Sequence, residues 1–221
     1  MVLTSPPAPQ PSRPGEDGDG AAVDAYEEAH VHGVYEAIAP HFSATRHKPW
    51  PLVSSFLASR APGSVGLDVG CGNGKNMGVN RDVVMLGCDR SAALASADFA
   101  ICIAVIHHLS TRERRVDAIR QLLRCIRRGH QGGGGGDDDD NDGGKVLVYV
   151  WALEQRSSRR GWDEGGEQDL LVPWGDRHAD KTFHRYYHLY RKGELEDEVI
   201  SAGGKVIKSG YERDNWWVIA G

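Results

Sequence analysis

The feature that most constrains this chain is a short apolar run that carries an acid near its end and then turns through alternate glycines. The residues are, in order, Leu67, Asp68, Val69, Gly70, Cys71, Gly72, Asn73 and Gly74. Glycine is needed where the backbone bends sharply and must approach a ligand without a Cβ in the way. The pattern therefore predicts a buried strand followed by a cofactor-binding loop.

The acid in front of the glycines separates two classes of cofactor. A phosphate-binding loop points backbone amides and a helix N-terminus at pyrophosphate, and the carboxylate of Asp68 would repel that group. A carboxylate suits the ammonium of a methionine moiety instead, which predicts S-adenosyl-L-methionine as the cofactor. A second acid, Asp89, follows the next apolar run about 20 residues later, where folds of this kind bind a ribose diol. The alternative role for Asp89 is an N-cap on the turn that follows.

The order of the elements predicts an α/β fold. Apolar runs suited to buried parallel strands cover residues 65–69, 83–88, 99–106 and 146–151. Helices are predicted over 25–38 with Pro40 closing it, 52–59, 111–126 with Ser110 or Thr111 as its cap, and 193–201. A hairpin of residues 205–209 and 215–220 is expected at the end of the chain. The alternation predicts a mostly parallel sheet with helices on both faces.

Two acidic segments stand apart from the predicted domain over residues 25–221. Residues 1–24 are rich in Pro, Gly and acids and are expected to be a disordered tail, and residues 131–144 are a Gly- and Asp-rich low-complexity loop. These two segments carry net charges of −3 and −5, so within the total of −5 the rest of the chain has a net charge of +3 and is mildly basic. A basic body is compatible with an RNA partner but does not demonstrate one.

Targeting signals and cysteine spacing bound the environment of the protein. No apolar run approaches the roughly 20 residues that span a bilayer, and the first residues lack the pattern of a secretory signal. We therefore expect a cytoplasmic protein that could also enter the nucleus. The cysteines have no spacing suited to zinc, so we expect reduced thiols and no metal site; they are Cys71, Cys88, Cys102 and Cys125.

Longer segments resemble one family closely. They are "YEAIAPHFSATRHKPWP", "DVGCGNGKNMGVN", "GCDRS", "IAVIHHLSTRERR", "WALEQRSSRRG" and "RYYHLYRKGEL" with "ERDNWWV". In order from about residue 31 to residue 220, they resemble the eukaryotic tRNA carboxymethyluridine methyltransferases. The resemblance implies a Rossmann-like class I methyltransferase fold with an antiparallel last strand. It also implies methyl transfer from S-adenosyl-L-methionine to the carboxylate of 5-carboxymethyluridine at the wobble position, which gives the methyl ester.

The resemblance implies two partners and a set of site residues. The partners are the tRNA anticodon loop and a small zinc-binding activator subunit that forms a heterodimer with the enzyme. Because a carboxylate is ionised at neutral pH, catalysis needs positioning and desolvation rather than a general base. We assign catalysis to His107, Arg46, Arg185 and Tyr187. We assign cofactor binding to Asp68, Gly70, Cys71, Gly72, Asn73, Gly74, Asp89, Arg90, Ala104, His108 and Lys48.

Several of these residues have a structural alternative. One of His107 and His108 could cap the following helix while the other packs, and the loop with Arg46 and Lys48 could simply be solvated. Tyr187 or Trp174 could stack on a base. The arginines Arg112, Arg114 and Arg115 are expected on a solvated helix face, with phosphate binding as the alternative.

The chain departs from the family between Asp89 and Phe99. Roughly 30 residues with a helix and an edge strand lie there in the family, whereas residues 90–98 are a short link. The missing strand, third in the order 3-2-1-4-5, is at an edge, so the sheet can survive without it. The link spans at most about 30 Å when extended, so we expect an extended strap or frayed neighbouring strands.

The short link leaves three hypotheses for function. The first is the tRNA wobble-uridine methyltransferase. The second is a non-catalytic relative that folds but does not hold the cofactor, and the third is a methyltransferase of small carboxylic acids.

Overall fold

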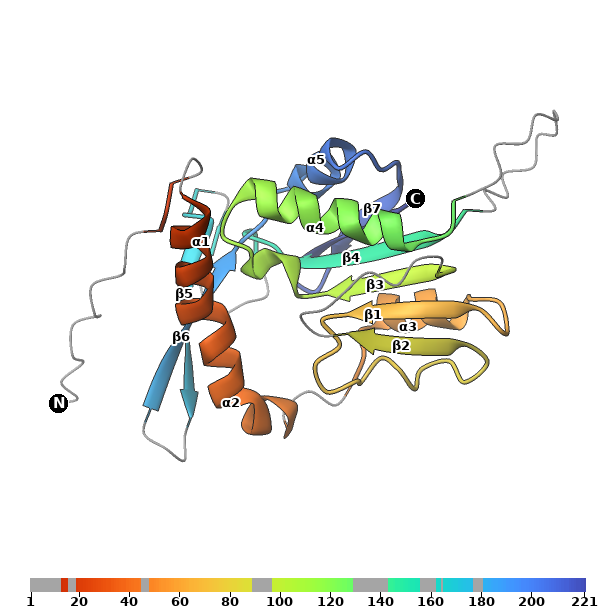
Figure 1. The fold of residues 1–221 in the computed structure, drawn as a ribbon, viewed down its shortest axis with the longest axis horizontal. Coiled ribbons are helices and arrows are strands. Elements are labelled where there is room, and N and C mark those ends of the chain that lie inside the picture. Colours follow the sequence, from red (N-terminus) through yellow and green to blue (C-terminus); the bar gives the residue numbers. More distant parts are fainter. Residues whose placement is uncertain are drawn as a thin grey trace.

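A computed structural model describes residues 13–15, 19–44, 48–88, 97–128, 143–155, 162–163, 165–176 and 181–221. Its main sheet has six strands (Figure 1). In spatial order they are β2 (Val84–Cys88), β1 (Val65–Val69), β3 (Phe99–Ile103), β4 (Lys145–Trp151), β8 (Asn215–Ala220) and β7 (Val206–Glu212). The first four are parallel, and β8 is antiparallel to both of its neighbours. The predicted α/β fold is confirmed.

The strand β2 forms one edge of the sheet. Within the described ranges no strand lies outside β2, as expected for a chain that lacks the family's third strand. Val84 and Leu86 on this strand are exposed. The predicted strap over residues 90–98 lies almost wholly outside the described residues, which resume at Ala97.

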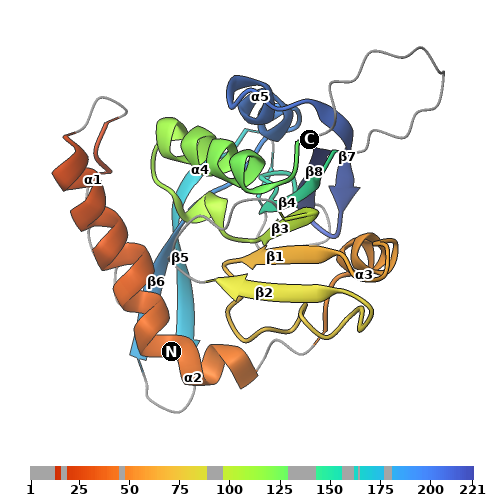
Figure 2. The ribbon, with the colours of Figure 1, turned by 45° about the vertical axis from the view of Figure 1, so that its right-hand side comes forward.

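Helices cover both faces of the main sheet (Figure 2). One apolar core lies between the sheet and the helices α4 (Arg112–Cys125) and α5 (Glu194–Ser201), and a second lies under α3 (Pro51–Ala58). The sequence forms α4 because Thr111 accepts a hydrogen bond from the Arg114 amide as its N-cap, while apolar residues recur at helical spacing. Full burial of one such Leu or Ile side chain stabilises the fold by about 1.5–3 kcal/mol.

The N-terminal helix is longer than the sequence predicted. It comprises α1 (Gly20–Glu27), a π-helical turn η1 (Glu28–His32) and α2 (Gly33–Ala44). The prediction that it starts at residue 25 and closes at Pro40 was wrong at both ends. Asp19 caps the start, and buried apolar side chains along the helix outweigh the one backbone hydrogen bond that proline lacks; they are Val23, Val31, Val34 and Ile38.

A separate antiparallel hairpin, which the sequence pattern did not predict, lies outside the main sheet. It consists of β5 (Asp169–Asp176) and β6 (Lys181–His188), which lie beside the N-terminal helix (Figure 1). Arg185 and Tyr187, two of the residues assigned to catalysis, lie within β6. Charged and aromatic side chains interrupt the apolar pattern here, so the period of two that marks a strand is hidden.

Membrane-spanning helices and the two acidic segments are the remaining features that the sequence addressed. In the part of the chain that the structure describes, no helix is long and apolar enough to cross a membrane. Most of the predicted tail and nearly all of the Gly- and Asp-rich loop lie outside the described residues. Residues 20–24, which were assigned to the tail, belong to α1.

Candidate functional site

A cavity of about 910 Å³ lies at the carboxyl ends of β1, β3 and β4. The strand arrowheads point toward the N-terminal helix, which forms the opposite wall (Figure 2). One end of the cavity is lined by the glycine loop, and the other by Tyr35, His107, His108, Trp151 and Tyr187. Its size is typical of small-molecule sites, and the carboxyl edge of a parallel sheet is where such folds bind ligands.

The glycine loop has the backbone conformation that its sequence predicts. Gly70, Gly72 and Gly74 have φ angles of +77°, +51° and +71°, which favour glycine. A Cβ on Gly70 would lie 2.3 Å from a methyl carbon of Val105. Gly70, Cys71, Gly72 and Asn73 line the cavity, and the amide of Gly74 donates to the Cys71 carbonyl and closes the turn behind them.

The acid of the motif lies behind this loop. Asp68 is 1 % exposed and is not part of the cavity wall. The Asn76 amide, which does line the cavity, donates from Nδ2 to Asp68 Oδ2 at 3.3 Å. Asp68 therefore faces the predicted cofactor site through Asn76, a residue that the sequence analysis did not select.

The other residues predicted to act on the cofactor or in catalysis differ in whether they line the cavity. Ala104 lines the cavity with a φ of +61°, an uncommon conformation for a residue with a Cβ and one that clusters at functional sites. Lys48 is exposed and is not part of the wall. Arg46, Asp89 and Arg90 lie outside the described residues.

The two histidines at the far end of the cavity are buried and neutral. Burial lowers the pKa of His108 to about 3, and burial, together with the neighbouring His108 and Arg185, lowers the pKa of His107 well below its usual range. His107 Nδ1 accepts a hydrogen bond from the Trp151 amide, so its proton is on Nε2. Within the described residues that Nε2 is buried and has no hydrogen-bond partner.

His108 is part of a hydrogen-bond chain with a fixed direction. Its Nδ1 lies 2.8 Å from the Tyr186 carbonyl, which can only accept, so Nδ1 carries the proton. The Tyr35 hydroxyl then donates to His108 Nε2 at 2.9 Å. Arg185 Nη1 and the Tyr187 hydroxyl donate to the Tyr35 oxygen at 3.3 and 3.2 Å. Tyr35 therefore connects the N-terminal helix to β6; it begins the quoted segment YEAIAPHFSATRHKPWP but was not among the predicted site residues.

Arg185 and Tyr187, both predicted to be catalytic, lie differently with respect to the cavity, since only Tyr187 is part of its wall. Arg185 is 2 % exposed and lies behind the cavity wall, with its guanidinium 5.7 Å from the Tyr35 ring centre. The Tyr187 ring is stacked on Trp151 at 4.4 Å and 16°, which covers one of its faces. A base cannot stack on that face without displacing Trp151. The other candidate for stacking, Trp174, contacts Phe183 on the hairpin and does not line the cavity.

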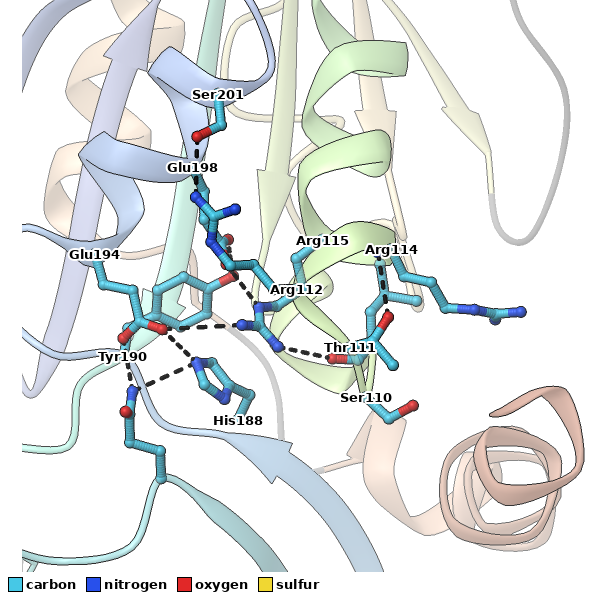
Figure 3. A network of polar contacts seen from close by, with 12 residues as sticks. Ser110, Thr111, Arg112, Arg114, Arg115, His188, Tyr190, Glu194, Glu198 and Ser201 are labelled. Carbon is cyan, nitrogen blue, oxygen red and sulfur yellow. Dashed lines mark hydrogen bonds and ion pairs between the residues drawn. The ribbon is translucent and has the colours of Figure 1, made fainter. Parts of the chain in front are cut away.

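A buried polar network holds this end of the site together (Figure 3). Arg115 donates to Glu198 at 2.9 Å, and Tyr190 donates to the same carboxylate. His188 lies between Asp169 and Glu194 at 3.0 and 2.7 Å. Burial alone would lower the pKa of His188, but its hydrogen bonds with these two carboxylates outweigh burial and raise it.

The arginines at the start of α4 belong largely to this structural network. The prediction of a solvated face was wrong for Arg115, which is 3 % exposed, because Glu198 on α5 compensates the buried charge. Arg114 pairs with Asp24 and Glu27 on α1. Arg112 donates to the Ser201 hydroxyl.

Comparison with known proteins identifies the family. The chain is 43% identical over 235 residues to the tRNA (carboxymethyluridine(34)-5-O)-methyltransferase of Schizosaccharomyces pombe, covering 88% of this chain and 97% of that protein. It is 37% identical to the Saccharomyces cerevisiae protein of the same name, covering 88% and 96%. The chain belongs to the tRNA (carboxymethyluridine(34)-5-O)-methyltransferase family. No family model matches it.

Solved structures of methyltransferase fold are similar to this member of the family. A Burkholderia thailandensis 1,6-didemethyltoxoflavin-N1-methyltransferase, bound to S-adenosylhomocysteine, superposes with a TM-score of 0.59 at 14% identity and covers 92% of each chain. The [4+2]-cyclase SpnF superposes with a TM-score of 0.53 at 13% identity, over 86% of this chain and 94% of that one. At this identity the similarity concerns the fold alone.

The alignment to the fission-yeast relative extends over 235 positions, more than the 221 residues of this chain. The relative therefore has residues with no counterpart in this chain.

Proposed function

We propose that this chain transfers the methyl group of S-adenosyl-L-methionine to the carboxylate of 5-carboxymethyluridine at the tRNA wobble position. The proposal rests on sequence identity. This chain is 43% and 37% identical to two proteins that are named for that reaction, and the alignments cover nearly the whole length of those proteins. The cavity supports it, because the wall combines a glycine loop with neutral histidines and aromatic rings.

The residues of the cavity fit this cofactor. Three left-handed glycines bring the backbone against the cavity, where a Cβ at Gly70 would collide with Val105. Asn76 adds a buried amide oxygen without a partner among the described residues, which suits a ligand that carries donors. The glycine loop and Asn76 would hold the methionine part of the cofactor, and Ala104, directly after β3, lines the same cavity.

The chemistry asks the protein for position rather than for proton transfer. When bound, the cofactor supplies a methyl group on a sulfonium sulfur; an ionised carboxylate oxygen can accept that methyl group without loss of a proton, and the sulfur leaves as a neutral thioether. His107 provides a neutral Nε2–H donor at the end of the cavity away from the glycine loop. A neutral donor orients a carboxylate without neutralising the charge that makes it nucleophilic.

The walls around His107 favour the same reaction by excluding water. Trp151 and Tyr187 stack on each other there, and His108 is closed off by Tyr35. The negative carboxylate and the positive sulfonium are both neutralised when the methyl group is transferred. These charges are less stabilised in such surroundings than in water, so the barrier to methyl transfer falls. Tyr35 is a positioning residue because it holds both His108 and Arg185.

Transfer of labelled methyl to tRNA tests the proposal. The purified chain, with and without an activator subunit, is incubated with labelled cofactor and tRNA that carries 5-carboxymethyluridine. Label that enters tRNA and is released by mild alkali supports the proposal, because a methyl ester hydrolyses whereas a methyl on a base nitrogen or ribose does not. Label on small carboxylic acids alone, or no label on either substrate, would contradict it.

We further propose a small zinc-binding activator subunit as partner and the cytoplasm as location. The support is the resemblance of the sequence segments to enzymes that work as such a heterodimer. Co-expression followed by gel filtration tests the partner: elution of the two chains together is expected, and separate elution would contradict it. Fluorescent tagging of the full chain tests the location.

A further inference from the structure

His32 ends the π-helical turn of the N-terminal helix and lines the cavity. Turns of this kind are single insertions in α-helices and are frequent at functional sites. From His32 onward the helix presents one stripe to the cavity, at the spacing i, i+3, i+4 and i+7; its members are His32, Tyr35, Glu36 and Ala39. His32 is half-buried, between the buried Val31 and the exposed Glu36, so a ligand in the cavity can reach its ring.

His32 can supply positive charge at the end of the cavity that holds the histidine pair. It lies close enough to His108 for the two side chains to interact electrostatically. His107 and His108 are neutral because of burial, and Arg185 lies behind the wall. Lys75, the one lysine among the described wall residues, follows the glycine loop at the other end. The imidazole of His32 is therefore the wall group that can present a charged donor at this end.

The ring of His32 is not engaged within the protein. Among the residues that the structure describes, none forms a hydrogen bond or an ion pair with it. The other histidine of the turn, His30, packs against the Tyr26 ring at 4.7 Å and is not part of the wall. Of these two histidines, only His32 is placed to meet a ligand.

We propose that His32 recognises the carboxylate of the substrate nucleotide; this assignment rests on the proposed function. An imidazole can take up a proton near neutral pH when an anion binds beside it, and the charged ring then donates a strong hydrogen bond to a carboxylate oxygen. Glu27 and Glu36, the acids of the wall, accept hydrogen bonds and do not suit an anion. Because His32 is half-buried, water still screens its charge, so the pairing orients the carboxylate and leaves it nucleophilic.

The test compares two RNAs that differ only in this group. Anticodon stem-loop RNAs with 5-carboxymethyluridine, or with its uncharged 5-carbamoylmethyl analogue, are titrated with the full chain and followed by fluorescence anisotropy. S-adenosylhomocysteine, which has no methyl group to transfer, is present throughout. The full chain is expected to bind the carboxylate RNA about tenfold more tightly. In His32→Gln that preference should fall to within about twofold, with the affinity for the carbamoyl RNA nearly unchanged.

Two further variants separate recognition from a structural role. His30→Gln is the matched control, because it removes a half-buried imidazole from the same turn but not from the cavity wall; it should keep the full preference. His32→Lys keeps a positive donor at the same position, so it should retain a preference of at least about fivefold. A purely structural imidazole would not be replaced by lysine in this way.

The outcomes distinguish this assignment from the proposed function. If His32→Gln keeps the full preference, the assignment is overturned while the proposed function stands. The same holds if His32→Gln weakens both RNAs equally, as loss of a phosphate contact would, or if His32→Lys shows no preference. If the unaltered chain transfers no methyl group to the carboxylate RNA when S-adenosyl-L-methionine is supplied, the proposed function is overturned together with the assignment.

Discussion

The two ends of the cavity are built in opposite ways. The cofactor end is one stretch of backbone, residues 70–76, in which glycine conformations decide the shape. The other end is assembled from side chains of the N-terminal helix, the turn after β3, the end of β4 and the hairpin strand β6. The contrast teaches that a local motif can specify a cofactor loop, whereas a substrate end can depend on the whole fold.

The largest expected effect concerns the network behind the substrate end. Glu198→Gln leaves the buried guanidinium of Arg115 without its charged partner, and we expect a loss of about 3–5 kcal/mol in the free energy of unfolding. Urea denaturation measures it. Asp117→Asn, which breaks the exposed ion pair with Arg120, should cost less than about 0.5 kcal/mol. A cost below about 1 kcal/mol for Glu198→Gln would show that the network does not hold this end.

The next effect concerns the cofactor end. Gly70→Val places a branched side chain against Val105 at a left-handed backbone position, and should weaken cofactor binding at least about a hundredfold in calorimetry. Gly72→Ala is the matched control, because its new Cβ would have no atom within 4 Å. Gly72→Ala should lower the free energy of unfolding by only about 1–2 kcal/mol, because its side chain strains the left-handed backbone. Equal binding losses in both variants would break the claim that close approach at Gly70 shapes the pocket.

A smaller effect separates the two ends by function. Tyr35→Phe removes the donor to His108 and the acceptor for Arg185, so methyl transfer to tRNA should fall about tenfold. The dissociation constant of the cofactor should change less than about twofold. Tyr211→Phe, which removes an exposed hydroxyl outside the cavity, is the control and should keep both values. A loss of cofactor affinity in Tyr35→Phe would mean that the two ends are not separate.

The smallest effect concerns pH. The pKa of His188 is raised on folding, so its stabilising contribution is complete below its unfolded pKa and is lost as the pH rises through its folded pKa. As the pH rises above the ordinary histidine pKa of about 6.5, the unaltered chain should therefore lose stability that His188→Gln does not lose. The lowered pKa values of His107 and His108 act with the opposite sign but are common to both proteins. Parallel pH profiles in urea denaturation would contradict this account.

The contrast between the two ends of the cavity also explains how much of the structure the sequence could predict. The strand β1, the loop after it and the cap Thr111 follow from local rules, and each was found where the motif indicated. The hairpin of β5 and β6 was missed because its charged and aromatic side chains are matched only in three dimensions. Arg115 was wrongly expected in solvent, since the partner that allows its burial, Glu198, is distant in sequence. Tyr35 and Asn76 lie within the quoted segments, but their contacts in the folded chain, not the motifs, define what they do.

Calorimetric titration of S-adenosyl-L-methionine into the purified chain, alone and with the activator subunit, tests the central claim most directly. The claim is that the glycine loop and the cavity beside it form a working cofactor site although the link after Asp89 is short. The account predicts one bound cofactor per chain with a dissociation constant in roughly the micromolar range. No binding up to about millimolar cofactor would contradict it.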